Sequence, residues 1–348
     1  MAVKPLPAIP MPTFCRHNHL IQNCPICARE QHVELRPVVT PSGPRPGSGA
    51  ATGGSARATA GSGTAVRQGA ARSGGRKSPG VTVRKLARDA DDGYRSSLVP
   101  GLKSSADADR LARELAFGAT RLRILETDPP GLYAKLRTEG SDLEERTWLA
   151  FMIAYLGPLE DDAPFAEIER LRTSWNAGAG PQLGDVRTGP RGAYVPGRTE
   201  RTIEAYRAWA ARSGSQAAGF VGEAAWAPER RFARVFERLA LPGFDRGARF
   251  DLLVTLGRVG VYELRAARLA FGGADPVTLA AKRVLGIGDP MLLERRAADL
   301  ADACGLPLEA LDTGFYNWER GSRAGLGIDA RIEPESEALG AASSALGL

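Results

Sequence analysis

Residues 15–32 contain nearly all the histidine and cysteine side chains of the chain, which are the preferred ligands of zinc. All three histidines and three of the four cysteines of the 348-residue chain lie there: Cys15, His17, His19, Cys24, Cys27 and His32. A Cys-x-His element followed by a Cys-x-x-Cys knuckle supplies the ligands of a tetrahedral zinc site, and no carboxylate stands between them to act as a base. We therefore expect one structural Zn²⁺ bound by Cys15, His17, Cys24 and Cys27, with His19 as the alternative to His17.

A second candidate site lies at residues 282–290, which read KRVLGIGDP. Two helices joined by an apolar-Gly-apolar-Gly turn form a helix-hairpin-helix, whose bare backbone can approach a phosphate and offer it amide hydrogens. We expect Gly286 and Gly288 to make this contact and Lys282 and Arg283 to add positive charge. The alternative is a tight turn between helices, with glycine ending the first one.

The elements around this motif follow a helical pattern from residue 81 onward, without a convincing alternating strand, which predicts an all-α domain. Residues 148–156 are apolar all round, as in a helix surrounded by others. Ser141 and Glu144 form a capping-box pattern before it. The Gly/Pro-rich connection 176–198 is long enough to suggest a functional loop. Helices are expected at 104–125, 141–156, 164–175, 199–212, 228–241, 246–259, 261–271, 276–285, 290–304 and 307–318.

The chain divides by composition into four parts. Residues 1–37 form the zinc knuckle, and residues 38–80 a Gly/Ser/Arg-rich linker that cannot bury enough apolar surface to fold. Residues 81–323 form the helical domain, and residues 324–348 read as a flexible tail. Ten basic and no acidic side chains lie in 35–88, whereas 89–348 carry a net charge of −5. The basic linker is therefore the part expected to be drawn to a polyanion such as DNA.

The motifs together resemble the helix-hairpin-helix DNA glycosylase fold, in which an Asp-Thr pair about 20 residues after the hairpin carries the catalytic aspartate. Here 24 residues separate Gly288 from Asp312-Thr313, and Gly314 replaces the usual histidine. More closely, the segment from Leu143 to Trp318 resembles the alpha-glutamyl/putrescinyl thymine pyrophosphorylase group. The similarity rests on Trp148-Leu149-Ala150-Phe151, Ala281-Lys282-Arg283-Val284 and Tyr316-Asn317-Trp318.

This resemblance implies that an amine from an amino acid or polyamine displaces pyrophosphate from a modified thymine in DNA. Such chemistry needs a carboxylate for the amine proton, cations for the leaving group and a pocket for a base rotated out of the stack. The helical part has no histidine, so the base must be Asp, Glu, Lys or Tyr. The candidate carboxylates are Asp289 and Asp312, and the candidate cations are Lys282, Arg283, Arg246 and Arg249.

Two non-enzymatic functions remain open. The protein could be a zinc-anchored DNA-binding protein that keeps the glycosylase shape without the chemistry, or a protein-interaction adaptor. No apolar run of membrane-spanning length and no apolar signal core occur, so we expect a cytoplasmic protein without a membrane partner.

The zinc hypothesis predicts one zinc ion per chain in a peptide of residues 1–40. Metal analysis should show that Cys24→Ser loses the ion, and that His17→Ala and His19→Ala together lose it as well. Loss of zinc in the cysteine variant with full retention in the double histidine variant would contradict the ligand set.

Overall fold

We analysed a computed structural model, which describes residues 89–138, 142–178 and 180–348. This part of the chain contains helices and loops but no strand, which confirms the all-α expectation. The zinc knuckle and the linker lie outside it. None of its helices is long and apolar enough to cross a membrane. The helices are α2 (Ser105–Thr127), α3 (Leu132–Arg137), α4 (Leu143–Leu156), α5 (Ala166–Leu171), α6 (Thr199–Arg212), α7 (Gln216–Val221), α8 (Pro228–Arg238), α9 (Arg246–Arg258), α10 (Pro276–Leu285), α11 (Pro290–Cys304), α12 (Leu308–Arg320) and α13 (Ser336–Leu346).

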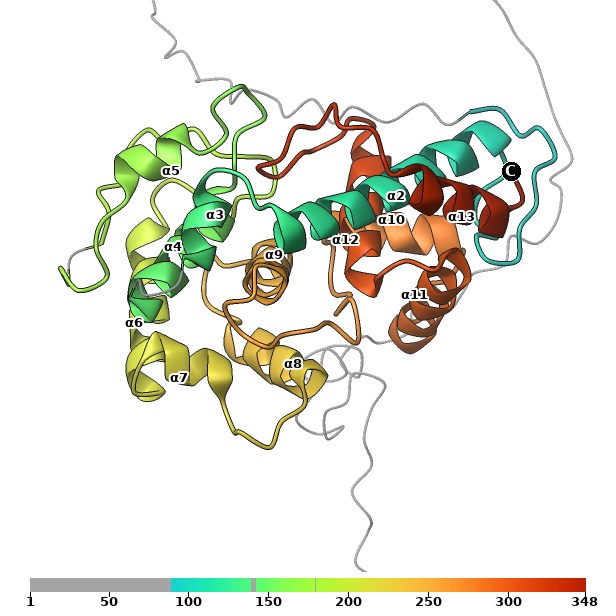
Figure 1. Cartoon of the computed structure of the whole chain (residues 1–348). Coiled ribbons are helices and arrows are strands. Elements are labelled where there is room, and N and C mark those ends of the chain that lie inside the picture. Colours follow the sequence, from blue (N-terminus) through green and yellow to red (C-terminus); the bar gives the residue numbers. More distant parts are fainter. Residues whose placement is uncertain (1–88, 139–141, 179) are drawn as a thin grey trace, which may run out of the picture. The chain divides into compact units, whose positions relative to one another are not determined.

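Two central helices, α4 and α9, form the middle of the core, and Figure 1 shows α9 nearly end-on among the other helices. Every residue of α4 from Thr147 to Leu156 is buried, as its uniformly apolar sequence predicts. The Phe151 ring stacks on the Tyr206 ring of α6 with 3.9 Å between centroids. Burial of these aromatic side chains supplies much of the hydrophobic stabilisation.

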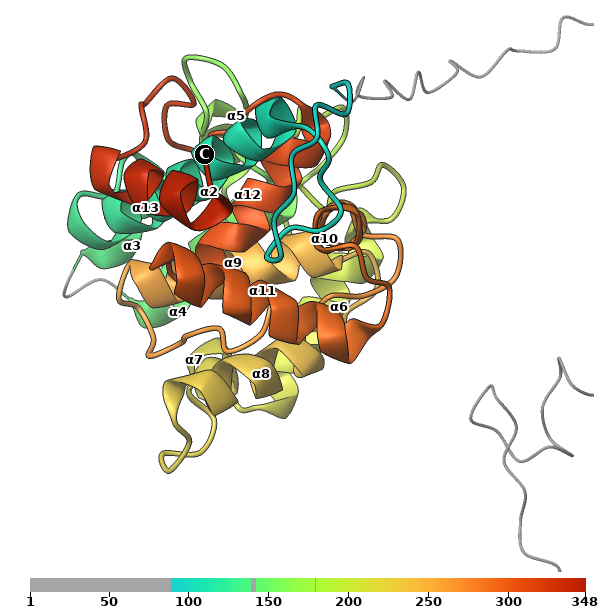
Figure 2. The same cartoon turned by 90° about the vertical axis from the view of Figure 1, so that its right-hand side faces the viewer.

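A close crossing joins α2 to α12, with α13 packed beside α2 (Figures 1 and 2). Gly118 on α2 and Gly314 on α12 lie at this crossing. A Cβ atom at Gly118 would overlap the carbonyl oxygen of Ala310, and one at Gly314 would lie 3.0 Å from the Cα atom of Leu115. The two helices can therefore approach this closely only with glycine at both positions.

The starts of several helices follow the caps that the sequence predicts. Asp275 and Asp289 accept hydrogen bonds from the amides of Thr278 and Leu292, and a proline follows each aspartate. Ser141 of the expected capping box lies outside the described residues, and Asp142 caps α4 by accepting from the amide of Glu144. The Glu144 side chain instead accepts from backbone amides at the start of α7.

Three other expectations are corrected by the structure. Residues 261–271 form an irregular segment rather than a helix, because their amides and carbonyls bond to side chains of other elements, as described below. The expected helix 164–175 is limited to α5. The tail from residue 324 contains α13, in which Ala342 and Leu346 are buried, because small residues let it pack against α2 and α11. The short helices α3 and α7 were not expected.

We predict that Gly118→Ala destabilises the protein, because the added methyl group meets a backbone carbonyl that cannot move aside. Overpacking of this kind costs about 1–3 kcal/mol of unfolding free energy. Gly340→Ala is the matched control: Gly340 is an exposed residue of α13 with open space around it, and the change should stabilise the helix by about 0.5–1 kcal/mol. Denaturant unfolding measures both. Equal effects of the two substitutions would contradict the tight crossing of α2 and α12.

Candidate functional site

The long loop between α5 and α6 inserts one arginine, Arg191, into the core. The amide of Gly189 donates to the carbonyl of Leu156 at 3.0 Å, and the amide of Tyr194 donates to the carbonyl of Tyr155 at 3.0 Å. A Cβ atom at Gly192 would overlap the carbonyl oxygen of Leu156, the last residue of α4, and one at Gly189 would overlap that of Pro158 just after it. Glycine on both sides of the Pro190-Arg191 pair therefore lets the loop lie directly on α4.

Arg191 there joins a buried cluster, which we call the charged centre: Arg191, Arg246, Asp251 and Asp312. Arg191 donates to a carboxylate oxygen of Asp251 at 2.6 Å and to Oδ1 of Asp312 at 2.6 Å, and Arg246 pairs with Oδ2 of Asp312. The side chain of Asp312 is 1% exposed and that of Arg191 4%. The structure thus brings together two residues that the sequence suggested, Asp312 and Arg246. Charges this deeply buried are stable only when each is paired.

The two carboxyl groups of the charged centre have opposite pKa shifts. Burial opposes ionisation of Asp312, but the attraction of Arg246 and Arg191 outweighs it and lowers the pKa of Asp312 below its ordinary value. Burial raises the pKa of Asp251, and the charge of Asp312 adds to the rise, although Arg191 opposes it. Asp312 is thus an anion with both oxygens occupied, and it can accept a proton only if one of the arginines moves.

Tyr316 ties α12 to the loop that carries Arg191. Its hydroxyl donates to the carbonyl of Pro190 at 2.8 Å, and the Arg191 guanidinium lies over its ring, 4.8 Å from the centroid. The next two residues anchor α12 to α2, since Asn317 donates to Glu114 and the Trp318 indole donates to the carbonyl of Asp107. The Tyr-Asn-Trp motif therefore positions the elements around the charged centre.

Arg246 connects the charged centre to the irregular segment before α10. Its guanidinium donates to the carbonyls of Leu269 and Ala270, and Ala270 has a positive φ of 53°. From the other side, the Glu294 carboxylate of α11 accepts from the amides of Leu269 and Phe271, each at 2.8 Å. Arg246 and Glu294 therefore clamp the backbone of residues 269–271 from both sides, and they hold it in a conformation that is not helical.

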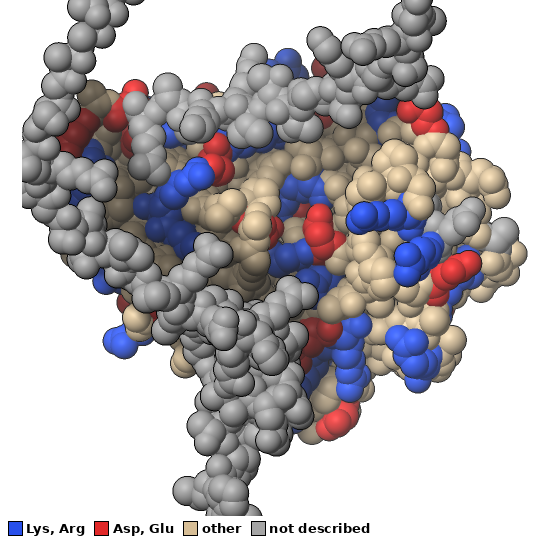
Figure 3. Space-filling model, turned by 180° about the vertical axis from the view of Figure 1, so that it is seen from behind, with Lys and Arg blue, Asp and Glu red and all other residues tan. Residues whose placement is uncertain are grey.

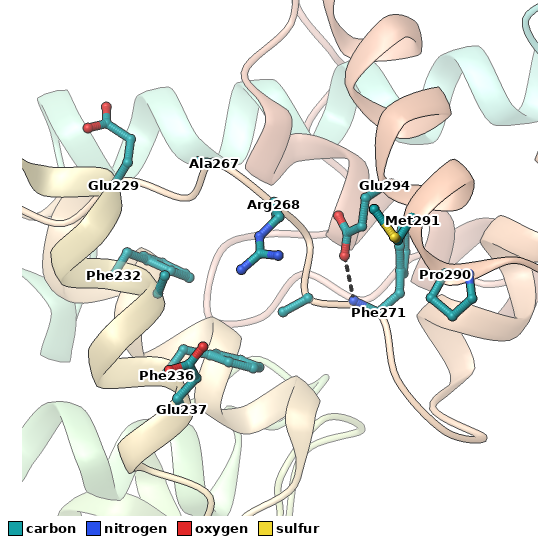
Figure 4. Close-up of a pocket in the computed structure, with 12 residues that line it drawn as sticks. Glu229, Phe232, Phe236, Glu237, Ala267, Arg268, Phe271, Pro290, Met291 and Glu294 are labelled. Carbon is teal, nitrogen blue, oxygen red and sulfur yellow. Dashed lines mark hydrogen bonds between the residues drawn. The ribbon is translucent and has the colours of Figure 1, made fainter. Parts of the chain in front are cut away.

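The clamped segment forms one wall of a cavity of about 410 Å³, which we call the α8–α11 pocket (Figure 4). Phe232 and Phe236 of α8 have nearly parallel rings, and Phe271 contributes a third aromatic side chain. Arg268 projects toward the cavity in Figure 4 and has no carboxylate partner among the described residues. Met291 of α11 lines the opposite side. The pocket has the size and apolar lining typical of small-molecule sites.

Arg249, another candidate cation, supports this pocket from behind. Its guanidinium lies over the Phe236 ring, 4.4 Å from the centroid, and donates to the Phe236 carbonyl at 3.1 Å. It is half-buried, and burial lowers its pKa. The structure thus places Arg249 behind an aromatic ring that lines the cavity.

The hairpin begins where α10 ends at Gly286, which is left-handed with φ 64°. No hydrogen bond to a described acceptor involves the backbone amides of Gly286, Ile287 and Gly288. Gly288 has no positive φ, and a Cβ atom there would meet nothing within 4 Å. Neither the backbone conformation nor a close contact among the described residues therefore requires glycine at 288.

The charged residues of the hairpin differ in availability. Lys282 is half-buried and has no described carboxylate partner, whereas exposed Arg283 pairs with Glu319. Exposed Asp289 uses its carboxylate to cap α11. Asp289 and Asp312 therefore occupy different environments, one at a surface turn and one in the charged centre.

Several functional candidates were missed by sequence reasoning: Arg191, Asp251, Arg268 and the three phenylalanines of the pocket. The only local signal for Arg191 was its position between two glycines in a long loop. Among the described residues, no group of three His, Cys, Asp or Glu side chains is arranged to hold a metal ion. The surface in Figure 3 has basic and acidic side chains interleaved around a hollow rather than a uniform basic stripe.

Replacing Asp312 by asparagine should destabilise the protein by about 3–5 kcal/mol, because two buried arginines lose their shared anion. Asp289→Asn is the matched control and should change stability by less than about 0.5 kcal/mol, since asparagine also caps helices and the site is exposed. Chemical denaturation measures both effects. A small, equal loss in the two variants would refute the pairing of the charged centre.

Comparison with known proteins finds one family to which part of this chain is similar. The family model of alpha-glutamyl/putrescinyl thymine pyrophosphorylase clade 3 matches residues 178–320. No curated protein and no solved structure matches the chain. The matched segment contains the charged centre, the α8–α11 pocket and the hairpin. Over residues 178–320 the chain thus matches the alpha-glutamyl/putrescinyl thymine pyrophosphorylase group, and the resemblance predicted from its motifs is confirmed.

Proposed function

We propose that this protein modifies thymine in DNA by replacing a pyrophosphate group on the modified base with an amine. The family match over residues 178–320 supports this class of reaction. The observation that carries the proposal is the position of Arg246. It pairs with Asp312 on one side and holds the wall of the α8–α11 pocket on the other, so it joins the candidate acidic residue to a cavity of suitable size.

The contents of the pocket suit a modified base. Phe236 and Phe271, which are half-buried, offer aromatic surfaces on which a planar heterocycle can stack, and buried Phe232 packs behind them. Arg268 supplies a positive charge for the pyrophosphate as negative charge develops on it. The carboxylates of Glu229 and Glu237 also line the cavity and could take a proton without disrupting the charged centre.

The nitrogen of an amino acid or polyamine attacks the exocyclic methylene carbon of pyrophosphorylated 5-hydroxymethyluracil. A C–N bond forms, the C–O bond breaks, and pyrophosphate leaves with the electron pair. The ammonium proton passes to a carboxylate. Asp312 and Asp289 are the candidates for this last step that the sequence suggests. Asp312 can take the proton only if Arg191 or Arg246 moves away. Asp289 lies at the hairpin, where it caps α11.

DNA is the proposed partner, bound at the hairpin through the free amides near Gly286 and Gly288 and through Lys282. The net charge of −5 on residues 89–348 is unfavourable for binding a duplex. We therefore propose that the basic linker and the zinc knuckle add affinity. A protein that binds DNA through these parts without turnover would be the non-catalytic alternative.

The proposal predicts turnover of a duplex that contains pyrophosphorylated 5-hydroxymethyluracil in the presence of a panel of amino acids and polyamines. Pyrophosphate release and the mass of the new nucleoside are the readouts. Arg268→Ala should lower the rate by about 100- to 1000-fold, since it removes a charge that faces the leaving group.

The control is Arg212→Ala, an exposed arginine at the end of α6 that does not line the pocket, which should leave the rate unchanged. DNA binding without turnover for every donor would support the non-catalytic alternative. An Arg268→Ala rate equal to that of the unaltered protein would remove Arg268 from the site.

A further inference from the structure

Arg121 of α2 is a deeply buried cation outside the charged centre. It is 2% exposed, yet no carboxylate oxygen of a described residue lies within 4.0 Å of its guanidinium, and its Nε has no hydrogen-bond partner there. The hydroxyl of Tyr133 lies beside it, but this group is uncharged and donates its hydrogen to the carbonyl of Leu326 at 2.8 Å. A guanidinium stays charged when it is buried, so Arg121 needs a counter-ion.

Arg121 lines a small cavity that also reaches the charged centre, and we call this space the Arg121 cavity. Its volume is about 20 Å³, which is room for one species of about the size of a water molecule. Arg191 and Asp251 of the charged centre line it as well, and most of the remaining wall is apolar. The Arg121 cavity shares no lining residue with the α8–α11 pocket, and it is too small for an amine donor or for pyrophosphate.

The wall of the Arg121 cavity carries two cations and one carboxylate. Asp251 accepts two hydrogen bonds from Arg191, one from Nε at 2.6 Å and one from Nη2 at 3.1 Å. The Nη1 of Arg191 makes no hydrogen bond to any acceptor in the described part of the chain. Asp251 is thus engaged by Arg191, and the positive charge of Arg121 is left without a close anion.

We propose that the Arg121 cavity binds one small monovalent anion, of the size of chloride, held by Arg121 and Arg191. Chloride is only slightly larger than water and accepts several N–H hydrogen bonds, which are strengthened when the donors are charged. A water molecule can bond the Nε of Arg121 but cannot balance its charge. The attraction is strong in this place because little water screens it.

The bound anion connects α2, which carries Arg121, to the loop that carries Arg191. It therefore adds a further charge contact to the network that positions the loop. This site does not depend on the proposed function, since it lies away from the pocket in which that reaction is placed.

The test measures the stability of the full chain by urea unfolding in sodium chloride, sodium bromide and sodium gluconate at equal ionic strength. Chloride and bromide suit the cavity, whereas gluconate is too large to enter it. An ion that binds only the folded protein raises the folding equilibrium constant in proportion to its concentration once the site is nearly full. Replacing gluconate stepwise should therefore raise this constant by up to about tenfold for each tenfold rise in chloride.

Two variants separate this site from general effects of salt on folding. Arg121→Gln removes the charge and keeps a polar side chain, so the dependence on chloride should disappear. Arg113→Gln is the matched control, because Arg113 is an exposed arginine of the same helix that pairs with exposed Asp109. This control should keep the chloride dependence of the unaltered protein. Comparison within each salt cancels the effects that salts have on folding in general.

A second measurement needs no variant. Crystals of the unaltered protein in sodium bromide should show a bromide ion, identified by its anomalous scattering, within hydrogen-bond distance of the Arg121 guanidinium. Absence of that ion from the cavity would overturn the proposal.

The stability measurements can also contradict it. Equal stability in chloride and gluconate would mean that water alone fills the cavity, and a bromide seen in crystals would then be an adventitious ion only. A chloride dependence that is unchanged in Arg121→Gln would assign the effect to another part of the chain. Either result would overturn the proposal, and neither would affect the proposed function, which is tested by turnover.

Discussion

The architecture of the site depends on keeping a set of buried charges paired. Asp312 is almost wholly shielded from water, and its ionised form is tolerated only because Arg191 and Arg246 occupy both of its oxygens. The two arginines come from different parts of the chain, a loop and the start of α9. The pairing therefore fixes the loop, α9 and α12 relative to one another, and any shift of one element would leave a buried charge unpaired.

Other features of the structure position the two arginines so that these buried charges stay paired. Glycines at 189 and 192 let the loop reach the end of α4, so that Arg191 can enter the core. Arg246 extends the same network outward to Ala270, whose positive φ is held in place by the clamp with Glu294. A buried ion cluster thus shapes the wall of an otherwise apolar pocket. The stability of the core and the geometry of the candidate site consequently have a common origin.

Sequence reasoning succeeded where the interactions are local. The starts of α10 and α11 follow from aspartate-proline pairs within one helical turn, and the burial of α4 follows from its uniformly apolar sequence. It failed where the partners are distant. Residues 261–271 have apolar spacing that resembles a helix, but Glu294 and Glu309 bind their backbone instead. Arg191 and Asp312 are 121 residues apart, so no local pattern could pair them, and single residues such as Arg268 gave no signal at all.

The pairing of Asp312 with the two arginines also makes the stability of the folded protein depend on pH in acid. Because the pKa of Asp312 is lowered in the folded protein, its contribution to stability is present above the ordinary value of 3.8 and is lost as the pH falls through the lower folded value. The most direct measurement is an NMR titration of the Asp312 carboxyl carbon, assigned by comparison with Asp312→Asn. The account predicts that this signal shows an ionised carboxylate at pH 3.8 and titrates only below it. A midpoint at or above 3.8 would contradict the account, because Asp312 would then not be held as an anion by Arg191 and Arg246.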